Sequence, residues 1–163
     1  PKEIVKQEIG YLEKLGVKFR WFGYYHNWIP QEHYYYVAEK YGFSSNPEGR
    51  SEGTYNKYAS LDDLTDPFHY YLSYIKFGLG RATSDAAHEI RDGHLTRDEG
   101  VALVQRYDHE FPSRYADVFY RYMDMTPEEF EEVVDAYRQP YLWERQNGVW
   151  RLKHQVQRLN EEG

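Results

Sequence analysis

The sequence predicts a mainly α-helical fold of about six to eight helices, with at most one or two short strands. Helix start signals, followed by apolar residues at i, i+3, i+4 and i+7, recur along most of the 163 residues. The alternation that is typical of a strand occurs convincingly only once, near the N-terminal end. A composition of 40% hydrophobic and 29% charged residues suits a chain that buries a sizeable core.

The N-terminal part is predicted to be a helix followed by a strand. Residues 2–15 have helical periodicity, and Gly16 ends the helix. Residues 17–25, VKFRWFGYY, alternate as in a short strand. A helix followed by a strand indicates the end of an α/β layer, so we divide the chain into residues 1–28 and a helical domain, 29–163. The residues expected to face inward in the first helix are Ile4, Val5, Ile9, Leu12 and Leu15.

The helical domain is expected to begin at Pro30, with a helix that is followed by a long polar loop over residues 44–59. Asp66 and Pro67 then start a helix predicted to span residues 66–80, with proline at its first position. The expected inward faces of these two helices are Tyr34, Val37, Ala38 and Tyr41, and Phe68, Tyr71, Leu72, Ile75 and Leu79.

The C-terminal third has further helix signals. Thr96 with Glu99, and Thr126 with Glu129, match the capping box, in which a hydroxyl and a carboxylate satisfy free backbone N–H groups. Pro112 is expected to begin another helix, and Asn147-Gly148 a turn that lets Trp143 and Trp150 pack back. The residues expected to face inward here are Tyr115, Val118, Phe119 and Tyr122, then Phe130, Val133, Val134 and Tyr137.

Composition excludes several classes of function. The absence of cysteine removes disulfides, thiolate catalysis and cysteine-based zinc sites, and it fits a cytoplasmic location. No apolar run approaches the roughly 20 residues that a membrane span needs. A net charge of −7 argues against a nucleic-acid partner. The 18 tyrosines either pack at the boundaries of amphipathic helices or form a surface on which a sugar or base stacks.

The first candidate site lies around Gly78 and Gly80. On a helical wheel His69, Ser73 and Lys76 share a face with Gly80, away from the apolar stripe. In one interpretation Lys76, Arg81 and the N-terminal amides of a helix capped by Ser84 bind a phosphate or pyrophosphate. In the other, the glycines only end a helix, and the basic residues pair with carboxylates such as Asp85 and Glu89.

The loop over residues 46–63 is the second candidate. It is long for a compact domain, and such loops are often functional. Tyr55, Tyr58 and Leu61 are expected to be buried, and its acidic pair could hold Mg²⁺ beside a nucleotide. Alternatively, Asp62 and Asp63 complement a helix dipole. The polar residues it offers are Arg50, Glu52, Lys57, Asp62 and Asp63.

The known catalytic motifs do not occur in the sequence. The 7 histidines form no HExxH or comparable ligand spacing, so we expect no metal site. A GxSxG elbow, a GxGxxG after a strand and a P-loop are also missing. The residues alone therefore indicate no complete catalytic machinery.

Long stretches of the chain nevertheless resemble one family. RSEGTYNKYASLDD and FHYYLSYIKFGLGRATSDAAHEIRDGHLTRDEGVALVQRYDHEFP are similar to the C-terminal half of bacterial N-acetyl sugar amidotransferases of the PP-loop ATP pyrophosphatase superfamily. GYYHNWIPQEHYYYVAEKYGFSSNP and YRQPYLWERQNGVWRLKHQ also resemble that family. The resemblance spans roughly residues 20 to 155.

The resemblance implies a role in lipopolysaccharide O-antigen or other surface-glycan biosynthesis. In that family ATP activates the acetamido oxygen of a nucleotide-linked N-acetyl sugar, and ammonia displaces AMP to leave an acetamidino group. Glutaminase and cyclase-like subunits supply the ammonia. ATP and magnesium are accordingly expected for the complete enzyme.

The sequence departs from the family in lacking an SGGxDS-type ATP loop and N-terminal cysteine pairs. Residues 1–28 are then expected to be the tail of the PP-loop domain, and this segment alone to bind no ATP and be inactive. The phosphate- or substrate-binding hypothesis includes the seven residues Lys76, Arg81, Lys57, Arg50, Glu52, His69 and Asp62. The alternative function is a non-catalytic docking module for the glutaminase and cyclase-like partners.

Overall fold

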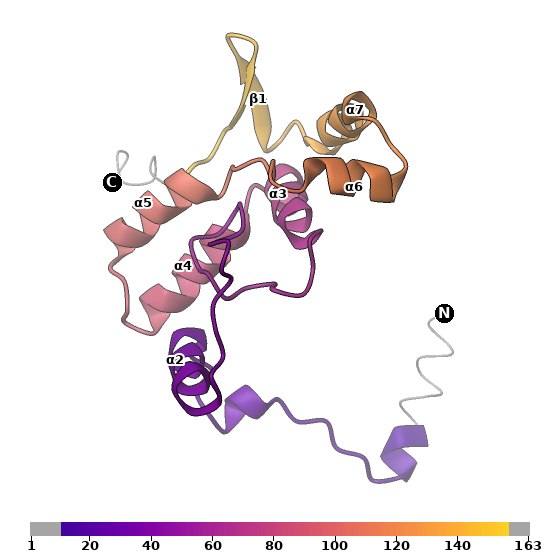
Figure 1. Cartoon of the computed structure of the whole chain (residues 1–163). Helices are drawn as coiled ribbons and strands as arrows, with labels where there is room; N and C mark the ends of the chain where they lie inside the picture. The colour runs from indigo at the N-terminus through magenta and orange to yellow at the C-terminus, as the bar shows by residue number, and fades with distance from the viewer. Residues whose placement is uncertain (1–10, 157–163) are drawn as a thin grey trace. The chain divides into compact units, whose positions relative to one another are not determined.

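A computed structural model of the chain describes residues 11–156 and is mainly α-helical (Figure 1). The chain divides into two compact units, residues 1–30 and 31–163. The identification of residues 1–28 as the end of a PP-loop domain stays a prediction. Within residues 11–156, no helix is long and apolar enough to cross a bilayer.

The strand predicted in the first unit is absent. Residues 11–14 are helical, residues 17–21 have no regular structure, and a short 3-10 helix, η1 (Phe22–Tyr24), follows. The alternating pattern was misleading because a strand needs a hydrogen-bonded neighbour, and the described part of this unit provides none. Leu12 and Leu15, predicted to face inward, are 45% and 58% exposed. Ile4, Val5 and Ile9 lie outside the described residues.

The second unit contains the other helices and one hairpin. The helices are α2 (Pro30–Tyr41), α3 (Asp66–Phe77), α4 (Arg81–Arg91), α5 (Arg97–Tyr107), α6 (Ala116–Met123) and α7 (Pro127–Tyr137). The strands are β1 (Trp143–Gln146) and β2 (Val149–Leu152). The start of α2 at Pro30 and of α3 at Asp66, the irregular loop between them, and both capping boxes are confirmed.

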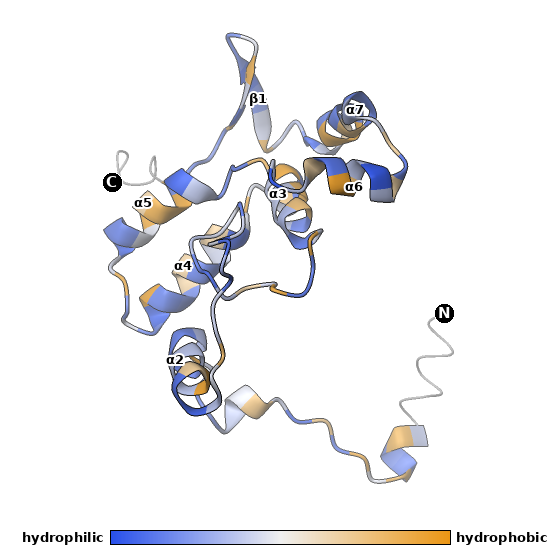
Figure 2. Cartoon of the chain, in the orientation of Figure 1, coloured by the Kyte–Doolittle hydropathy of each residue, from blue (hydrophilic) through white to orange (hydrophobic). Residues whose placement is uncertain are grey.

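The core forms around α3. Phe68 and Ile75 are each 1% exposed, and the Phe68 ring stacks on that of Phe119 at a centroid distance of 3.8 Å. Figure 2 shows that α3, α6 and α7 each carry both hydrophobic and hydrophilic residues, as expected of helices with one buried face. The buried hydrophobic cluster consists of Phe68, Ile75, Phe119, Phe130, Val134, Trp143 and Leu152.

Several predicted core positions are wrong. Helix α3 ends at Phe77 and not at residue 80, because Gly78 adopts a left-handed φ of 71°, so Leu79 is 56% exposed. Helix α6 starts at Ala116, four residues after the predicted Pro112. Since a short helix buries only a narrow stripe, four residues predicted to face inward on α6 and α7 are exposed: Val118, Tyr122, Val133 and Tyr137.

The C-terminal segment forms a hairpin that the sequence indicated only by its turn. Strands β1 and β2 pair antiparallel, with Trp143 opposite Leu152 and Gln146 opposite Val149. Asn147 and Gly148 both have positive φ, 52° and 80°, as a two-residue hairpin turn requires. The indole Nε1 of Trp143 donates to the Ile75 carbonyl oxygen at 2.7 Å, which joins the hairpin to the free C-terminal end of α3.

Candidate functional site

The loop between α2 and α3 is fixed by a carboxylate from the segment that follows α5. Glu110 accepts two hydrogen bonds from the Arg50 guanidinium, at 2.6 and 2.7 Å, and a third from the Gly53 backbone N–H at 3.1 Å. Gly53 is buried with a φ of +85°, a conformation that favours glycine. This bidentate pair orders the loop, and it engages Arg50, one of the predicted site residues.

A second carboxylate, Asp85 on α4, anchors the next part of the loop. It accepts hydrogen bonds from the Thr54 hydroxyl at 2.7 Å, the Asn56 amide at 2.8 Å and the Arg81 Nε at 2.8 Å. The Arg81 guanidinium also lies 5.4 Å from the centre of the Tyr70 ring. The second interpretation of the sequence, in which the basic residues pair with carboxylates, is therefore confirmed for Arg81.

A third carboxylate, Asp108, occupies the N-terminus of α4. Its oxygens accept from the backbone N–H groups of Gly80 at 2.8 Å and Thr83 at 3.0 Å, and from the Thr83 hydroxyl at 2.6 Å. A Cβ atom at Gly80 would lie 2.5 Å from an Asp108 carboxylate oxygen. The amides that the sequence suggested for a phosphate thus bind the protein's own anion, and the N-cap is Gly80, not a serine.

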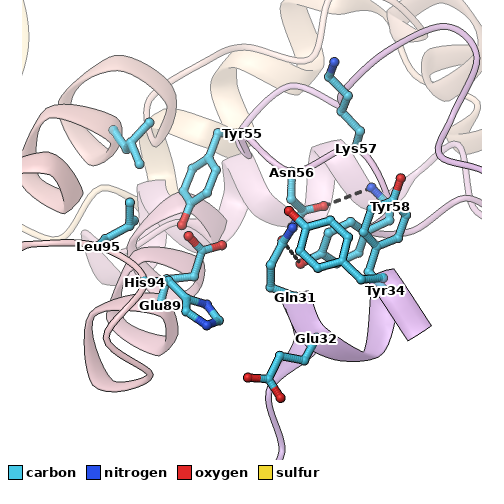
Figure 3. Close-up of a pocket in the computed structure, with 12 residues that line it drawn as sticks. Gln31, Glu32, Tyr34, Tyr55, Asn56, Lys57, Tyr58, Glu89, His94 and Leu95 are labelled. Carbon is cyan, nitrogen blue, oxygen red and sulfur yellow. Dashed lines mark hydrogen bonds between the residues drawn. The ribbon is translucent and has the colours of Figure 1, made fainter. Parts of the chain in front are cut away.

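Two of these carboxylates, Glu110 and Asp85, hold the loop beside an open cavity of about 620 Å³ (Figure 3). Helix α2 forms one side and the segment Tyr55–Tyr58 a second. The third side consists of the end of α4, the connection that follows it, and Leu103 of α5. A volume in this range is typical of small-molecule sites. The lining residues are Gln31, Glu32, Tyr34, Tyr35, Tyr55, Asn56, Lys57, Tyr58, Glu89, His94, Leu95 and Leu103.

The tyrosines of this cavity are held in defined positions. The rings of Tyr34 and Tyr58 stack with centroids 4.7 Å apart and planes inclined by 13°. The Tyr58 hydroxyl donates to the Gln31 side chain at 3.0 Å, and the Tyr58 backbone N–H donates to the Asn56 side chain at 3.3 Å. Burial, together with the charges of Glu89 and Asp85, raises the pKa of Tyr58 to about 12. The rings of Tyr34 and Tyr58 and the side-chain amides of Gln31 and Asn56 are therefore held in fixed positions around the cavity.

Glu89 supplies the charge at the opposite wall. Burial, and then repulsion from Asp85, raises the pKa of the Glu89 carboxyl above its ordinary value. The Tyr55 hydroxyl points toward this carboxyl in Figure 3. That hydroxyl is buried and has no hydrogen-bond partner of normal geometry in the described part of the chain. Burial, followed by the charges of Glu89 and Asp85, raises the pKa of Tyr55.

The predicted site residues do not gather in this cavity. Lys57 lines it, but its side chain points away from the tyrosines (Figure 3), and neither Lys76 nor Arg81 is among the lining residues. Lys76 is exposed and lies 5.3 and 5.5 Å from the ring centres of Phe77 and Tyr137. The phosphate-binding role of Lys76 and Arg81 stays a prediction.

The remaining predicted site residues lie at the surface or in structural contacts. Glu52 accepts from the Arg114 backbone N–H at 3.1 Å. Asp62 and His69 are exposed, and so is Leu61, which was wrongly predicted to be buried. Among residues 11–156, no group of three or more histidine or acidic side chains is arranged to hold a metal ion.

Sequence reasoning missed most of the cavity. The available signal was the crowding of tyrosine in two runs, HYYY at residues 33–36 and TYNKY at residues 54–58. These runs lie on either side of a turn-rich stretch, and only the fold shows that Tyr34 and Tyr58 stack. Asp85 and Glu89 were both named as partners for the basic residues; Asp85 pairs with Arg81, whereas Glu89 forms no ion pair in the described residues.

Comparison with known proteins identifies one family. The family model described as "LPS biosynthesis protein WbpG-like, C-terminal domain" matches residues 52–157, which is more than half of the chain. The match includes Tyr55–Tyr58, Glu89 and His94, so two of the three sides of the cavity lie within it. No curated protein was found to match the chain.

Proposed function

The chain belongs to the WbpG-like C-terminal domain family of LPS biosynthesis proteins, and we propose that it is the helical part of an ATP-dependent sugar amidotransferase. The reaction converts the acetamido group of a nucleotide-linked N-acetyl sugar to an acetamidino group. ATP adenylates the amide oxygen and releases pyrophosphate. Ammonia then adds to the same carbon, and AMP departs with the oxygen, so that nitrogen replaces oxygen.

The tyrosine cavity is the main structural support for the proposal. Its volume of about 620 Å³ is adequate for a hexose with part of its nucleotide. Flat tyrosine rings bury the apolar face of a sugar or base, while their hydroxyls stay available for hydrogen bonds. The amides of Gln31 and Asn56 hold Tyr58 in place beside that surface. This chemistry suits a neutral, hydroxylated ligand with flat faces.

The proposal divides the complete enzyme between two parts. The SGGxDS-type loop implied by the sequence resemblance would bind ATP and magnesium, and the present chain would bind the sugar. Lys57, which is exposed at the edge of the cavity, is a reasonable contact for the sugar diphosphate. Lys76 and Arg81 remain candidates for contacts with the leaving phosphates. Glutaminase and cyclase-like partners would deliver the ammonia.

The reaction itself is the test. The complete protein that carries this chain is incubated with ATP, magnesium, ammonium chloride and the nucleotide-sugar pool of a bacterium that produces it. We expect mass spectrometry to detect a nucleotide sugar in which NH replaces one oxygen, and only when ATP is present. Unchanged nucleotide sugars, with ATP consumed or not, would contradict the amidotransferase proposal.

A docking role is the second candidate, and one surface favours it. Met123 and Val133, which are 48% and 38% exposed, lie with Glu129 and Glu132 around a shallow hollow on α6 and α7. Such an apolar surface with acidic neighbours suits a partner subunit with a basic, partly apolar face.

The source of nitrogen separates docking from catalysis. Val133→Asp in the complete enzyme should reduce turnover with glutamine and leave turnover with free ammonium chloride unchanged, because free ammonia bypasses the partner. A matched control is Val149→Asp, at another exposed valine. Equal turnover of Val133→Asp and the unaltered enzyme with glutamine would exclude this surface as the docking site.

A further inference from the structure

The Glu89 side of the cavity differs in chemistry from the Gln31 side. Tyr34, Tyr35, Tyr55 and Tyr58 line the cavity together with the Glu89 carboxylate. Faces of aromatic rings carry partial negative charge and attract cations, most strongly where water is displaced. A half-buried carboxylate that shares a cavity with tyrosine rings is therefore a poor site for an anion and a good one for an organic cation.

The Glu89 carboxylate is not neutralised by the protein. None of the ion pairs within residues 11–156 involves Glu89. The neighbouring carboxylate, Asp85, is bonded to Arg81, Thr54 and Asn56. Lys57 points away from the tyrosines (Figure 3), so the lining groups that stabilise the Glu89 charge are the His94 imidazole and the Tyr55 hydroxyl, and neither forms an ion pair with it in the described residues. The half-buried charge is thus available to a ligand.

The Tyr55 hydroxyl supports the same conclusion. It is buried, points toward the Glu89 carboxyl (Figure 3), and lacks a hydrogen-bond partner of normal geometry in the described structure. A small movement of Glu89 would let one carboxylate oxygen accept the Tyr55 proton. The other oxygen would then face the cavity, so the pair is arranged to bind a donor that enters from there.

We infer that the Glu89 end of the cavity binds a planar nitrogen cation of the amidinium class. Two parallel N–H groups of an amidinium match a carboxylate as an arginine fork does, and its flat face stacks on a tyrosine ring. Its biological meaning rests on the proposed function, whose product carries an amidinium where the substrate carries a neutral amide. The site would favour the group that the reaction creates, since positive charge develops there as nitrogen replaces oxygen.

The inference is tested with acetamidinium chloride and acetamide, which have the same heavy-atom skeleton and differ in charge. Binding to the 163-residue chain is measured by NMR titration at constant ionic strength, with sodium chloride as the blank. We expect millimolar acetamidinium to shift the tyrosine resonances and to bind at least about tenfold more tightly than acetamide, or about 1.4 kcal/mol. Equal affinities on the unaltered chain would overturn the inference.

Two charge-removing variants locate the cation. Glu89→Gln keeps the shape and removes the charge, so the preference for acetamidinium should disappear. Glu32→Gln removes the other lining carboxylate, which is exposed at the start of α2, and should retain the preference. A preference that persists in Glu89→Gln, with folding verified by circular dichroism, would also overturn the inference.

These outcomes are independent of the enzymatic test. A chain that prefers acetamidinium while the complete protein makes no acetamidino sugar would leave the cation site standing and remove the proposed function. If the complete enzyme makes the product but the chain shows no preference for acetamidinium, the proposed function stands and the cation site is wrong.

Discussion

Gly78 and Gly80 lie two residues apart and are required for different physical reasons. Gly78 caps α3 with a φ of 71°, which most side chains avoid. Gly80 has ordinary extended backbone, but its Cα faces the Asp108 carboxylate so closely that a Cβ would lie 2.5 Å from an oxygen. The second glycine is therefore needed for close approach to an anion that caps α4.

Gly80→Ala should lower the free energy of unfolding by about 1–3 kcal/mol, because the added methyl group displaces Asp108 from buried N–H groups. Gly23→Ala is the matched control, since an added Cβ there meets nothing within 4 Å. Chemical denaturation measures both. A Gly80→Ala chain as stable as Gly23→Ala would show that the contact is not needed.

Lys76 is exposed, whereas Arg81 pairs with Asp85, so substitutions at the two positions should differ in their effect on stability. In the complete enzyme, alanine at either position should lower turnover at least about tenfold, or about 1.4 kcal/mol of barrier, if both stabilise leaving phosphates. Arg81→Ala should also lower the melting temperature because Asp85 loses its cation, whereas Lys76→Ala, at an exposed position, should not. Turnover per folded molecule within about twofold of the unaltered enzyme for both variants would end the hypothesis.

At the scale of elements, α3 organises the second unit. Its Ile75 side chain is 1% exposed, and the Ile75 carbonyl accepts the Trp143 indole proton. Its Phe68 ring packs on Phe119 and, edge to face, on Phe130. These two residues thus contact α6, α7 and the hairpin.

Ile75→Ala should reduce the free energy of unfolding by about 2–5 kcal/mol, as other truncations of buried aliphatic residues do. Leu79→Ala is the control, because the side chain of Leu79 is 56% exposed. Urea titrations of both variants give the comparison. Similar midpoints for Ile75→Ala and Leu79→Ala would contradict the central place of α3.

Local signals predicted the helices well and their contacts poorly. The capping boxes at Thr96 and Thr126 each join residues three positions apart, so the local sequence is enough to predict them. The role of Gly80 depends on Asp108, 28 residues away, and no local spacing shows that. The strands of the hairpin, WERQ and VWRL, do not alternate apolar and polar residues, so the pattern of a strand is missing from them. The cavity depends on bringing α2 beside the loop and α4, which is a property of the fold.

At the scale of the whole molecule, the proposed function makes the chain one part of a larger activity. It contains no SGGxDS or GxxxxGK[ST] loop to hold the phosphates of ATP. We expect the purified 163-residue chain to release no AMP from ATP with magnesium present. Magnesium-dependent AMP release above that of a heat-denatured sample would show that this chain binds ATP by itself.

If the tyrosine cavity binds the sugar substrate, loss of one of its stacked rings should lower kcat/KM of the complete enzyme for the nucleotide sugar. Tyr34→Ala removes one ring of the stacked pair, while Tyr122→Ala removes a ring that is 76% exposed and outside the cavity. We predict that Tyr34→Ala lowers kcat/KM for the nucleotide sugar by at least about tenfold, whereas Tyr122→Ala stays within about twofold of the unaltered enzyme. Equal kcat/KM for the two variants, with both folded, would contradict the assignment of the cavity to the sugar.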